Sequence, residues 1–370
     1  MTLASYHTLG RSGLRVSRLA LGTMTFGTES GWGCDEATSR AMFDRYLEAG
    51  GNFIDTADIY TLGTSERWVG KFIAERNLRD HVVLATKYTH NSTNTARNPN
   101  AAGNGRKNLI RSLEASLARL GTDYIDLYFL HTWDRITPVE EVVRTMDDLV
   151  RQGKIRHYAL SDVPAWYASR AATLAECSAM EAPCALQMEY SIVQRGIEYE
   201  FTDMGQDLGM GILAWSPLAS GLLSGKYRPN AVAEEQNEGR LKTTAKVANP
   251  SLQKLTPRNW EIVAELEAVA RELARPMAQV AVNWVANRPA VSSVLLGATR
   301  LDQLEQTLGA LDFELPAELE QRLDRAGRPE PIFPYAFIDT MAPRMHGGAL
   351  VEEKPPRYAQ RVASRRGGWR

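Results

Sequence analysis

The chain alternates short apolar segments with longer segments of helical character, and it does so eight times. The short segments are continuously apolar, as strands of a parallel sheet covered on both faces must be. They span residues 18–22, 52–56, 82–86, 124–129, 155–160, 185–188, 211–215 and 291–296. This alternation indicates the α/β class, because each strand is followed by a segment that can cross back over the sheet.

Each apolar segment is followed by a stretch with helical periodicity. These stretches cover residues 36–49, 66–76, 109–120, 139–151, 166–177, 200–207, 259–273 with 278–286, and 301–308. Eight strand–helix units fit a closed (β/α)8 TIM barrel better than an open doubly wound sheet, which usually stops earlier. The sequence therefore predicts one barrel domain over residues 1–327, although its length alone would also allow two or three domains.

Three segments lie outside the repeat. Residues 6–9 and 15–17, joined through Gly10 and Gly13, predict an N-terminal β-hairpin that plugs the barrel bottom. Residues 229–256 predict a long loop after the seventh strand, on the face where barrel active sites lie. Residues 328–370 predict a C-terminal extension, because too little apolar material follows for a second domain. Its basic end, residues 354–370, is predicted to be a solvated tail, with partner docking as the alternative.

The charge balance excludes some classes of partner. The chain has 43 Lys and Arg against 44 Asp and Glu, which argues against nucleic acid or an anionic membrane held by bulk charge. Its three cysteines form no C-x-x-C pair, so neither a zinc site nor a disulfide framework is expected, and no metal is predicted. No apolar run approaches the ~20 residues that span a bilayer. We expect a soluble, cytoplasmic protein.

Polar residues at the C-terminal ends of barrel strands are the candidates for chemistry. Asp55 ends the second strand and Tyr60 follows it, Lys87 ends the third, and His131 ends the fourth. Each of them alone has an ordinary structural explanation, such as a helix cap or a solvated strand end. Together they predict a proton-donating site, because the ends of neighbouring strands converge on one mouth of a closed barrel.

The chemistry of this set is specific. A free phenol has a pKa near ~10, too high for efficient proton donation near neutral pH. A nearby ammonium, here Lys87, favours the phenolate and lowers that pKa, and the carboxylate of Asp55 keeps the ammonium charged. The imidazole of His131 can hydrogen-bond and orient the incoming oxygen. No Ser or Cys stands beside a base, so a nucleophilic triad is not indicated.

These motifs resemble the aldo-keto reductase superfamily. The segments that carry the likeness are Gly51–Tyr60, Ser65-Glu66 with Gly70, Ala85–Lys87 and Leu130-His131, and the match runs from about residue 9 to residue 310. The likeness is nearest to the aryl-alcohol-dehydrogenase-like branch, through residues 84–89, 105–108, 131–134 and 161–166. The resemblance implies reversible hydride transfer between NADP(H) and a carbonyl, with Tyr60 as the proton donor.

The resemblance also assigns the cofactor contacts. Ser161, Gln187 and Asp162 would hold the nicotinamide carboxamide, although the family usually has Asn at the last position and an ionised Asp accepts but cannot donate. Trp215 would stack on the nicotinamide ring. The other assigned positions are Gly22, Thr23, Met24, Asp55, Ser216, Pro217, Leu218, Gly221, Ser224, Lys226, Gly297, Thr299, Arg300, Gln303, Gln306 and Thr307. Arg300 is the candidate for the 2′-phosphate, which would favour NADPH over NADH, and its alternative is an exposed surface Arg.

An apolar, aromatic-lined mouth is predicted for the substrate, suited to a ring-bearing or bulky carbonyl. Its predicted lining residues are Met24, Trp32, Tyr88, Trp133 and Trp166. The leading hypothesis is an NADPH-dependent carbonyl reductase that acts on a small molecule and runs as an alcohol dehydrogenase in reverse. A cofactor-binding regulatory subunit of a channel, with little turnover, is the main alternative. A barrel lyase that uses Lys87 as a Schiff base is a third hypothesis.

Overall fold

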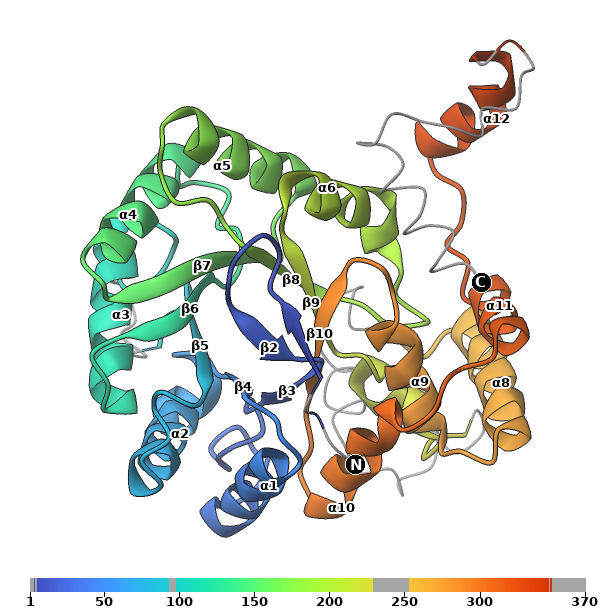
Figure 1. Ribbon diagram of the computed structural model, residues 1–370, viewed down its shortest axis with the longest axis horizontal. Coiled ribbons are helices and arrows are strands. Elements are labelled where there is room, and N and C mark those ends of the chain that lie inside the picture. Colours follow the sequence, from blue (N-terminus) through green and yellow to red (C-terminus); the bar gives the residue numbers. More distant parts are fainter. Residues whose placement is uncertain (1–2, 4, 93–97, 229–252, 346, 348–370) are drawn as a thin grey trace.

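The computed structural model of the chain describes residues 3, 5–92, 98–228, 253–345 and 347. Eight parallel strands close into a barrel in the order β10-β3-β4-β5-β6-β7-β8-β9 (Figure 1). These strands are β3 (Leu19–Gly22), β4 (Phe53–Asp55), β5 (Val83–Tyr88), β6 (Ile125–Leu130), β7 (Ile155–Ser161), β8 (Ala185–Glu189), β9 (Gly211–Trp215) and β10 (Val291–Leu296). The predicted TIM barrel is confirmed.

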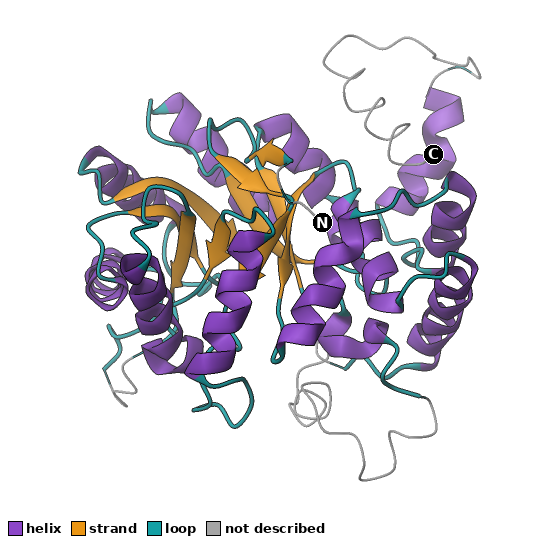
Figure 2. Ribbon diagram, turned by 60° about the horizontal axis from the view of Figure 1, so that its bottom comes forward, coloured by secondary structure: helices purple, strands orange, loops and turns teal. Residues whose placement is uncertain are grey.

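Helices surround the strands on the outside (Figure 2). They are α1 (Glu36–Glu48), α2 (Thr64–Glu75), α3 (Arg106–Leu120), α4 (Val139–Arg151), α5 (Ala165–Cys177), α6 (Phe201–Leu208), α8 (Pro257–Glu272), α9 (Met277–Ala286), α10 (Leu301–Leu308) and α11 (Ala317–Ala326). Short 3-10 turns are η1 (Tyr60–Gly63), η2 (Gly196–Tyr199), η3 (Ala219–Ser224) and η5 (Gly309–Leu311). In α4 the buried Val142, Val143, Met146 and Leu149 form one stripe at helical spacing, which explains why this segment packs as a surface helix.

The strands divide the core into two layers. Phe53, Val83 and Ala85 belong to a cluster inside the barrel, whereas Ile54 and Leu84 belong to the larger cluster between the barrel and the helices. Successive side chains of a strand point to opposite faces, so this alternation continues to the strand ends. The same period directs Lys87 into the barrel.

The N-terminal hairpin is also confirmed. Strand β1 (Tyr6–Thr8) pairs antiparallel with β2 (Arg15–Ser17), and the hairpin lies across the centre of the barrel in Figure 1. Leu9 and Val16 are fully buried in the cluster inside the barrel. Gly10 has φ +57°, and a Cβ there would lie 2.3 Å from the carbonyl oxygen of Gly209, which follows α6 and precedes β9. The hairpin therefore closes the N-terminal end of the barrel and leaves the other end for a site.

The C-terminal extension contains a helix that the sequence did not predict, α12 (Tyr335–Met345), which stands apart from the barrel in Figure 1. Its contact with the barrel includes Tyr335 stacked on Tyr199 with ring centroids 5.5 Å apart. Most of the predicted loop after β9, residues 229–252, and the predicted basic tail, residues 354–370, lie outside the described residues. Within the described part, no helix is long and apolar enough to cross a membrane.

Candidate active site

A buried ion pair joins the ends of β4 and β5. The Lys87 ammonium nitrogen lies 2.6 Å from the Asp55 carboxylate and 2.8 Å from the Thr56 carbonyl oxygen. The two side chains are 0% and 1% exposed. Burial alone would lower the pKa of Lys87, but the Asp55 carboxylate and then the Tyr60 hydroxyl raise it above its usual value. Lys87 is therefore protonated at neutral pH.

The Tyr60 hydroxyl lies against this pair. It is 3.2 Å from the Lys87 ammonium nitrogen, which sits 4.8 Å from the centroid of the tyrosine ring. Tyr60 begins a turn in which Thr61 and Leu62 take left-handed backbone angles, with φ of 45° and 53°. The Thr61 hydroxyl fastens the turn by donating to the Phe26 carbonyl at 2.6 Å. This turn holds the tyrosine above the strand end that carries Lys87.

His131 follows β6 directly and completes the predicted set. Its backbone N–H donates to the Tyr88 carbonyl at 3.0 Å, and its ring meets the Tyr60 ring edge-on with centroids 6.0 Å apart. The Nδ1 atom is buried and has no hydrogen-bond partner within the described residues. Burial, followed by the charge of Lys87 and then by His90, holds the pKa of His131 well below its usual value. The imidazole is therefore neutral and has hydrogen-bonding capacity to offer a ligand.

A second histidine near the site was not predicted. The His90 ring lies edge-on to His131 with centroids 4.9 Å apart, and its Nε2 is 3.4 Å from the Thr132 hydroxyl. Burial lowers the pKa of His90. The sequence did contain one signal for His90, because it comes three residues after Lys87 and therefore lies at the C-terminal end of the barrel.

The ends of β7, β8 and β9 bring the predicted carboxamide group of residues beside the ion pair. Gln187 donates from Nε2 to the second Asp55 oxygen at 2.8 Å, and the Trp215 indole N–H donates to Asp162 at 3.2 Å. Ser161 is buried at the end of β7. Gln187 therefore contacts the ion pair directly, and Ser161, Asp162 and Trp215 lie at the ends of the neighbouring strands β7 and β9.

Aromatic side chains gather in the segments that follow β6 and β7. Trp133 lies 5.5 Å from Trp166 and 6.1 Å from Tyr167, measured between ring centroids. Trp166 is 55% exposed, so the cluster offers an aromatic surface to solvent at this end of the barrel. Tyr167 was not predicted, although it adjoins Trp166 in the sequence.

Tyr88 does not belong to this surface. It is fully buried in the layer between the barrel and the helices, where its ring stacks on Tyr128 and its hydroxyl donates to the Asn104 carbonyl at 3.3 Å. The strand period explains the placement, because Lys87 points into the barrel and its neighbour must point outward. Met24 and Trp32 are half-buried in the segment after β3.

Comparison with known proteins identifies the family. Residues 18–328 match the aldo/keto reductase family. The chain is 34% identical to norsolorinic acid reductase of Aspergillus flavus over 350 residues, 91% of this chain and 85% of that protein. It is 32% identical to an aryl-alcohol dehydrogenase of Pestalotiopsis microspora over 330 residues, 88% of this chain and 82% of that protein. It is also 36% identical to a probable voltage-gated potassium channel subunit beta of Oryza sativa subsp. japonica over 312 residues, 83% of this chain and 91% of that protein.

The chain belongs to the aldo/keto reductase family. The resemblance inferred from the motifs is thereby confirmed, and relatives named as oxidoreductases support an oxidoreductase. Aldo/keto reductases generally use nicotinamide cofactors.

The loop after β9 fits an anionic group. Ser216, Ser220 and Gly221 have φ of 55°, 59° and 96°, so the backbone turns sharply here. A Cβ on Gly221 would lie 3.1 Å from Cε and 3.3 Å from the ammonium nitrogen of Lys226, so this side chain lies over the turn. The turn and its ammonium form a cradle whose shape and charge suit a pyrophosphate. Pro217 and Leu218 lie within this turn, and the Ser224 hydroxyl donates to the Gly221 carbonyl at 2.7 Å.

The segment predicted to hold the adenosine end of the cofactor follows β10. Some of its groups are open to a ligand, and others are bonded within the protein. Around Gly297 an added Cβ would meet nothing within 4 Å, so this backbone is open to approach. Gln303 accepts at Oε1 from the Thr299 N–H at 3.0 Å. Thr307 donates its hydroxyl to the Gln303 carbonyl at 3.0 Å, so that group is directed at its own helix. The Gln306 carbonyl accepts from Gln279 at 2.9 Å.

Arg300 lies at the rim of this segment. It is 65% exposed and pairs with both carboxylate oxygens of Asp302 at 3.0 Å. It can reach a ligand only if it leaves or shares that carboxylate. Near β3, the Thr23 hydroxyl donates to the Asp55 carbonyl at 2.9 Å, so Gly22 and Thr23 support the strand end that carries Asp55.

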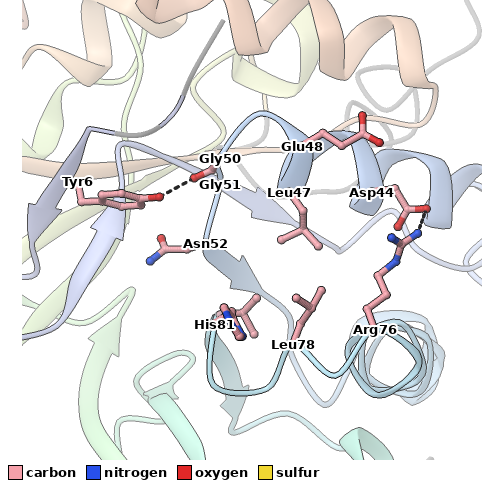
Figure 3. Close-up of a pocket in the computed structure, with 11 residues that line it drawn as sticks. Tyr6, Asp44, Leu47, Glu48, Gly50, Gly51, Asn52, Arg76, Leu78 and His81 are labelled. Carbon is pink, nitrogen blue, oxygen red and sulfur yellow. Dashed lines mark hydrogen bonds and ion pairs between the residues drawn. The ribbon is translucent and has the colours of Figure 1, made fainter.

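A separate open pocket of about 670 Å³ lies at the opposite end of the barrel (Figure 3). Leu47 and Leu78 line its apolar part, and Asp44 pairs with Arg76 at its edge. Asn52 and Val82, which also line it, stand at the starts of β4 and β5, so this pocket is distinct from the site around Lys87.

Proposed function

We propose that this aldo/keto reductase is a cytoplasmic NADP(H)-dependent enzyme that reduces an aldehyde or ketone to the alcohol, reversibly. One observation carries the proposal: the Lys87 ammonium contacts both the Asp55 carboxylate and the Tyr60 hydroxyl, with the neutral ring of His131 beside them. This arrangement suits the protonation of an oxygen that is becoming negative.

Bound NADPH would supply a hydride to the carbonyl carbon of the substrate. Tyr60 gives its hydroxyl proton to the carbonyl oxygen as negative charge develops there. Lys87 stabilises the phenolate that remains, and Asp55 keeps Lys87 charged in a buried position. His131 directs a hydrogen bond to the same oxygen and orients the carbonyl. In alcohol oxidation the Tyr60 phenolate accepts the alcohol proton by the same path.

The cofactor positions support the same proposal. Ser161, Asp162 and Gln187 would hold the carboxamide, and Trp215 would form the platform for the nicotinamide ring. The turn at Ser216–Lys226 would hold the pyrophosphate, and Arg300 would meet a 2′-phosphate. The Trp133–Trp166 surface suits a planar aromatic carbonyl. Relatives named for norsolorinic acid and for aryl alcohols agree with a ring-bearing substrate.

The test is NADPH oxidation by the purified protein in the presence of aryl aldehydes and ketones. Tyr60→Phe should lower kcat by about a factor of 10²–10⁴ or more, because it removes the proton donor. Tyr6→Phe is the matched control, since this tyrosine is 44% exposed and bonds the Gly50 carbonyl near the hairpin. Unchanged turnover in Tyr60→Phe would remove Tyr60 from the mechanism.

The lyase alternative requires an unprotonated amine on Lys87. The ion pair with Asp55 and the raised pKa of Lys87 work against a Schiff base at this residue. Borohydride should therefore trap no substrate adduct on Lys87. A trapped adduct would favour the lyase hypothesis over the reductase.

A second candidate function is supported by the relative named as a potassium channel subunit beta. In this function the chain would bind the cofactor and a membrane protein and would turn over slowly or not at all. Stable co-purification with a membrane protein, together with cofactor binding and no turnover on the carbonyl panel, would favour this candidate.

A further inference from the structure

A buried asparagine joins three segments at the C-terminal end of the barrel and has no part in the chemistry described above. Asn104 lies just before α3 and is fully buried. Its side-chain oxygen accepts from the hydroxyl of Thr89, after β5, at 2.7 Å. Its Nδ2 donates to the carbonyl of Thr132, after β6, at 3.1 Å. Because a carbonyl can only accept, the amide must face Thr132 with its nitrogen, and both ends of the amide are used.

These bonds form a closed cycle that passes through the backbone of His131. The His131 N–H donates to the Tyr88 carbonyl at 3.0 Å and lies 3.3 Å from the Thr89 hydroxyl oxygen. The Thr89 hydroxyl donates to Asn104, and Asn104 donates to the carbonyl of Thr132, the residue that follows His131. Asn104 therefore holds the His131 backbone on both sides, through Thr89 at its N–H and through Thr132 at its carboxyl side.

The same loop holds Thr89 in a strained conformation. Thr89 has φ +134°, which a β-branched residue rarely adopts. Its carbonyl accepts from the Gly103 N–H at 2.7 Å, and its hydroxyl is bonded to Asn104. Such strain persists only where surrounding contacts over-determine the conformation, and it is concentrated at functional sites. Gly103 and Asn104 thus keep the Thr89 hydroxyl within reach of the His131 N–H.

Asn104 also holds the far end of the segment that begins at His131. Its backbone N–H donates to the Asp134 carboxylate at 2.8 Å. The same carboxylate accepts from the Thr137 hydroxyl at 2.6 Å and from the Thr137 N–H at 2.9 Å. The segment from Thr132 to Asp134 is therefore attached to one buried residue at both of its ends.

The ring of His131 lacks the hydrogen bond that usually orients a functional histidine. Such a ring is ordinarily held by a partner at its second nitrogen. Here the Nδ1 atom is buried and has no partner among the residues that the structure describes. The orientation of the ring therefore depends on the His131 backbone and on the rings of Tyr60 and His90 that pack against it.

We propose that Asn104 is a positioning residue for His131, and that its hydrogen-bonded cycle replaces the usual bond to the imidazole. The inference rests on the proposed function, in which His131 orients the substrate carbonyl. A displacement of about 1 Å at a group that positions the substrate can cost about 10²-fold in rate. The bonds of Asn104 described above go to none of the predicted cofactor residues, so its loss should act on turnover and leave cofactor binding unchanged.

The first measurement follows the His131 ring in the protein without cofactor or substrate. The chain has six histidines, so in protein labelled with 13C-histidine the ring resonance of His131 is identified by its absence in His131→Phe. Asn104→Ala should shift this resonance, because the backbone loses its attachment. Asn283→Ala is the matched control, since this buried asparagine of α9 donates to the Ala310 and Phe313 carbonyls and should leave the resonance in place. An unshifted resonance in Asn104→Ala would overturn the inference.

The second measurement is turnover with NADPH and an aryl aldehyde, expressed per folded molecule. Asn104→Ala should lower kcat about tenfold and leave the Kd for NADPH unchanged, whereas Asn283→Ala should leave both unchanged. In the His131→Phe background, Asn104→Ala should cost no further turnover, because the residue that it positions is gone. A full tenfold loss in that background would show a merely structural role and would also overturn the inference.

Variants of Thr89 test the cycle with a smaller perturbation. Thr89→Val removes the hydroxyl and keeps the shape of the side chain, so it should reproduce the shift of the His131 resonance and much of the loss in kcat. Thr89→Ser restores the hydroxyl and should recover most of that loss. Equal behaviour of the two variants would exclude the cycle as the cause. If the natural protein reduces no carbonyl, the proposed function is wrong, and the His131 resonance still decides the positioning role of Asn104.

Discussion

Two buried polar networks stand at opposite ends of the barrel, and they differ in what their groups are bonded to. At the N-terminal end the Tyr46 hydroxyl lies 2.8 Å from the Leu19 carbonyl, 3.1 Å from the Phe53 N–H and 2.7 Å from the Ser17 hydroxyl. At the C-terminal end the Lys87 ammonium bonds one carboxylate, one carbonyl and the Tyr60 hydroxyl. The first network is neutral and ends mainly on backbone groups, whereas the second is charged and ends mainly on side chains.

This difference separates stability from reactivity. The Tyr46 network joins the starts of β3 and β4 to α1, and a Cβ on Gly51 would lie 2.2 Å from the tyrosine ring, so the packing there leaves no space. The Lys87 network leaves hydrogen-bonding capacity beside it, such as the buried Nδ1 atom of His131. Substitutions at the first network should therefore change stability, and those at the second should change chemistry as well.

Lys87→Met should have a large effect on both turnover and stability. It removes the ammonium beside Tyr60 and leaves the Asp55 carboxylate buried without its positively charged partner. We expect turnover to fall by about 10³-fold or more and the free energy of unfolding to fall by about 3–5 kcal/mol. Steady-state kinetics and urea unfolding, measured on the same preparation, check the two effects.

A double variant separates the two consequences. Asp55→Asn with Lys87→Met removes both charges, so much of the lost stability should return while turnover stays low. Recovery of turnover in the double variant would mean that the ammonium is not needed for proton transfer. Failure to recover stability would mean that the cost of Lys87→Met does not come from an unpaired carboxylate.

The sequence was sufficient to predict the barrel, the hairpin and the grouping of Asp55, Tyr60, Lys87 and His131. The physical reason is that parallel strands carry all their C-terminal ends to one edge, so residues at strand ends must meet. Tyr88 was wrongly assigned to the substrate mouth even though the necessary rule was available. The two-residue period that directs Lys87 inward directs Tyr88 outward.

Other features depend on contacts that no periodic pattern encodes. The hydrogen bond between Asp162 and Trp215 joins residues 53 positions apart, and the packing of His90 on His131 depends on how two loops fold over the strand ends. The helix α12 contains a proline at position 343 and lies in a segment rich in Pro, Gly and Arg, so composition indicated no helix. These features follow from tertiary packing, which outweighs local propensity.

Asp58 is a buried carboxyl near the C-terminal end of the barrel, and its ionisation should lower the stability of the protein. It is fully buried, and neither of its carboxylate oxygens has a hydrogen-bond partner within the described residues. Burial and then the charge of Glu66 raise the pKa of Asp58 to about 7. Because this pKa exceeds the unfolded value, stability should fall as pH rises from about 4 to about 7.

Asp58→Asn should remove the loss of stability that is expected as pH rises from about 4 to about 7. The variant should match the natural protein at pH 4 and be more stable at pH 8, by up to about 4 kcal/mol if the full difference in pKa acts on folding. Urea unfolding at both pH values measures the effect, with Asp80→Asn as a surface control. An equal stability difference at the two pH values would show that Asp58 does not titrate as expected.

Tyr46→Phe should cost less and should act on stability alone. The variant keeps the ring packed over Gly51 but leaves the Phe53 N–H and the Leu19 carbonyl without the hydroxyl, a loss of about 1–3 kcal/mol. Turnover per folded molecule should be unchanged at a temperature well below the unfolding transition. A fall in kcat without a fall in stability would contradict the assignment of the Tyr46 network to stability and of the Lys87 network to chemistry.

The smallest expected effect is at the rim, where Arg300 and Asp302 pair in solvent. Exposed ion pairs contribute little to stability, so the carboxylate should act mainly by competing with a cofactor phosphate for the guanidinium. Arg300→Ala should weaken NADPH binding about fivefold and leave NADH binding nearly unchanged, because only NADPH carries the 2′-phosphate. Asp302→Asn should strengthen NADPH binding about twofold, since it frees Arg300 and removes a like charge. Equal effects of Arg300→Ala on both cofactors would remove Arg300 from the 2′-phosphate site.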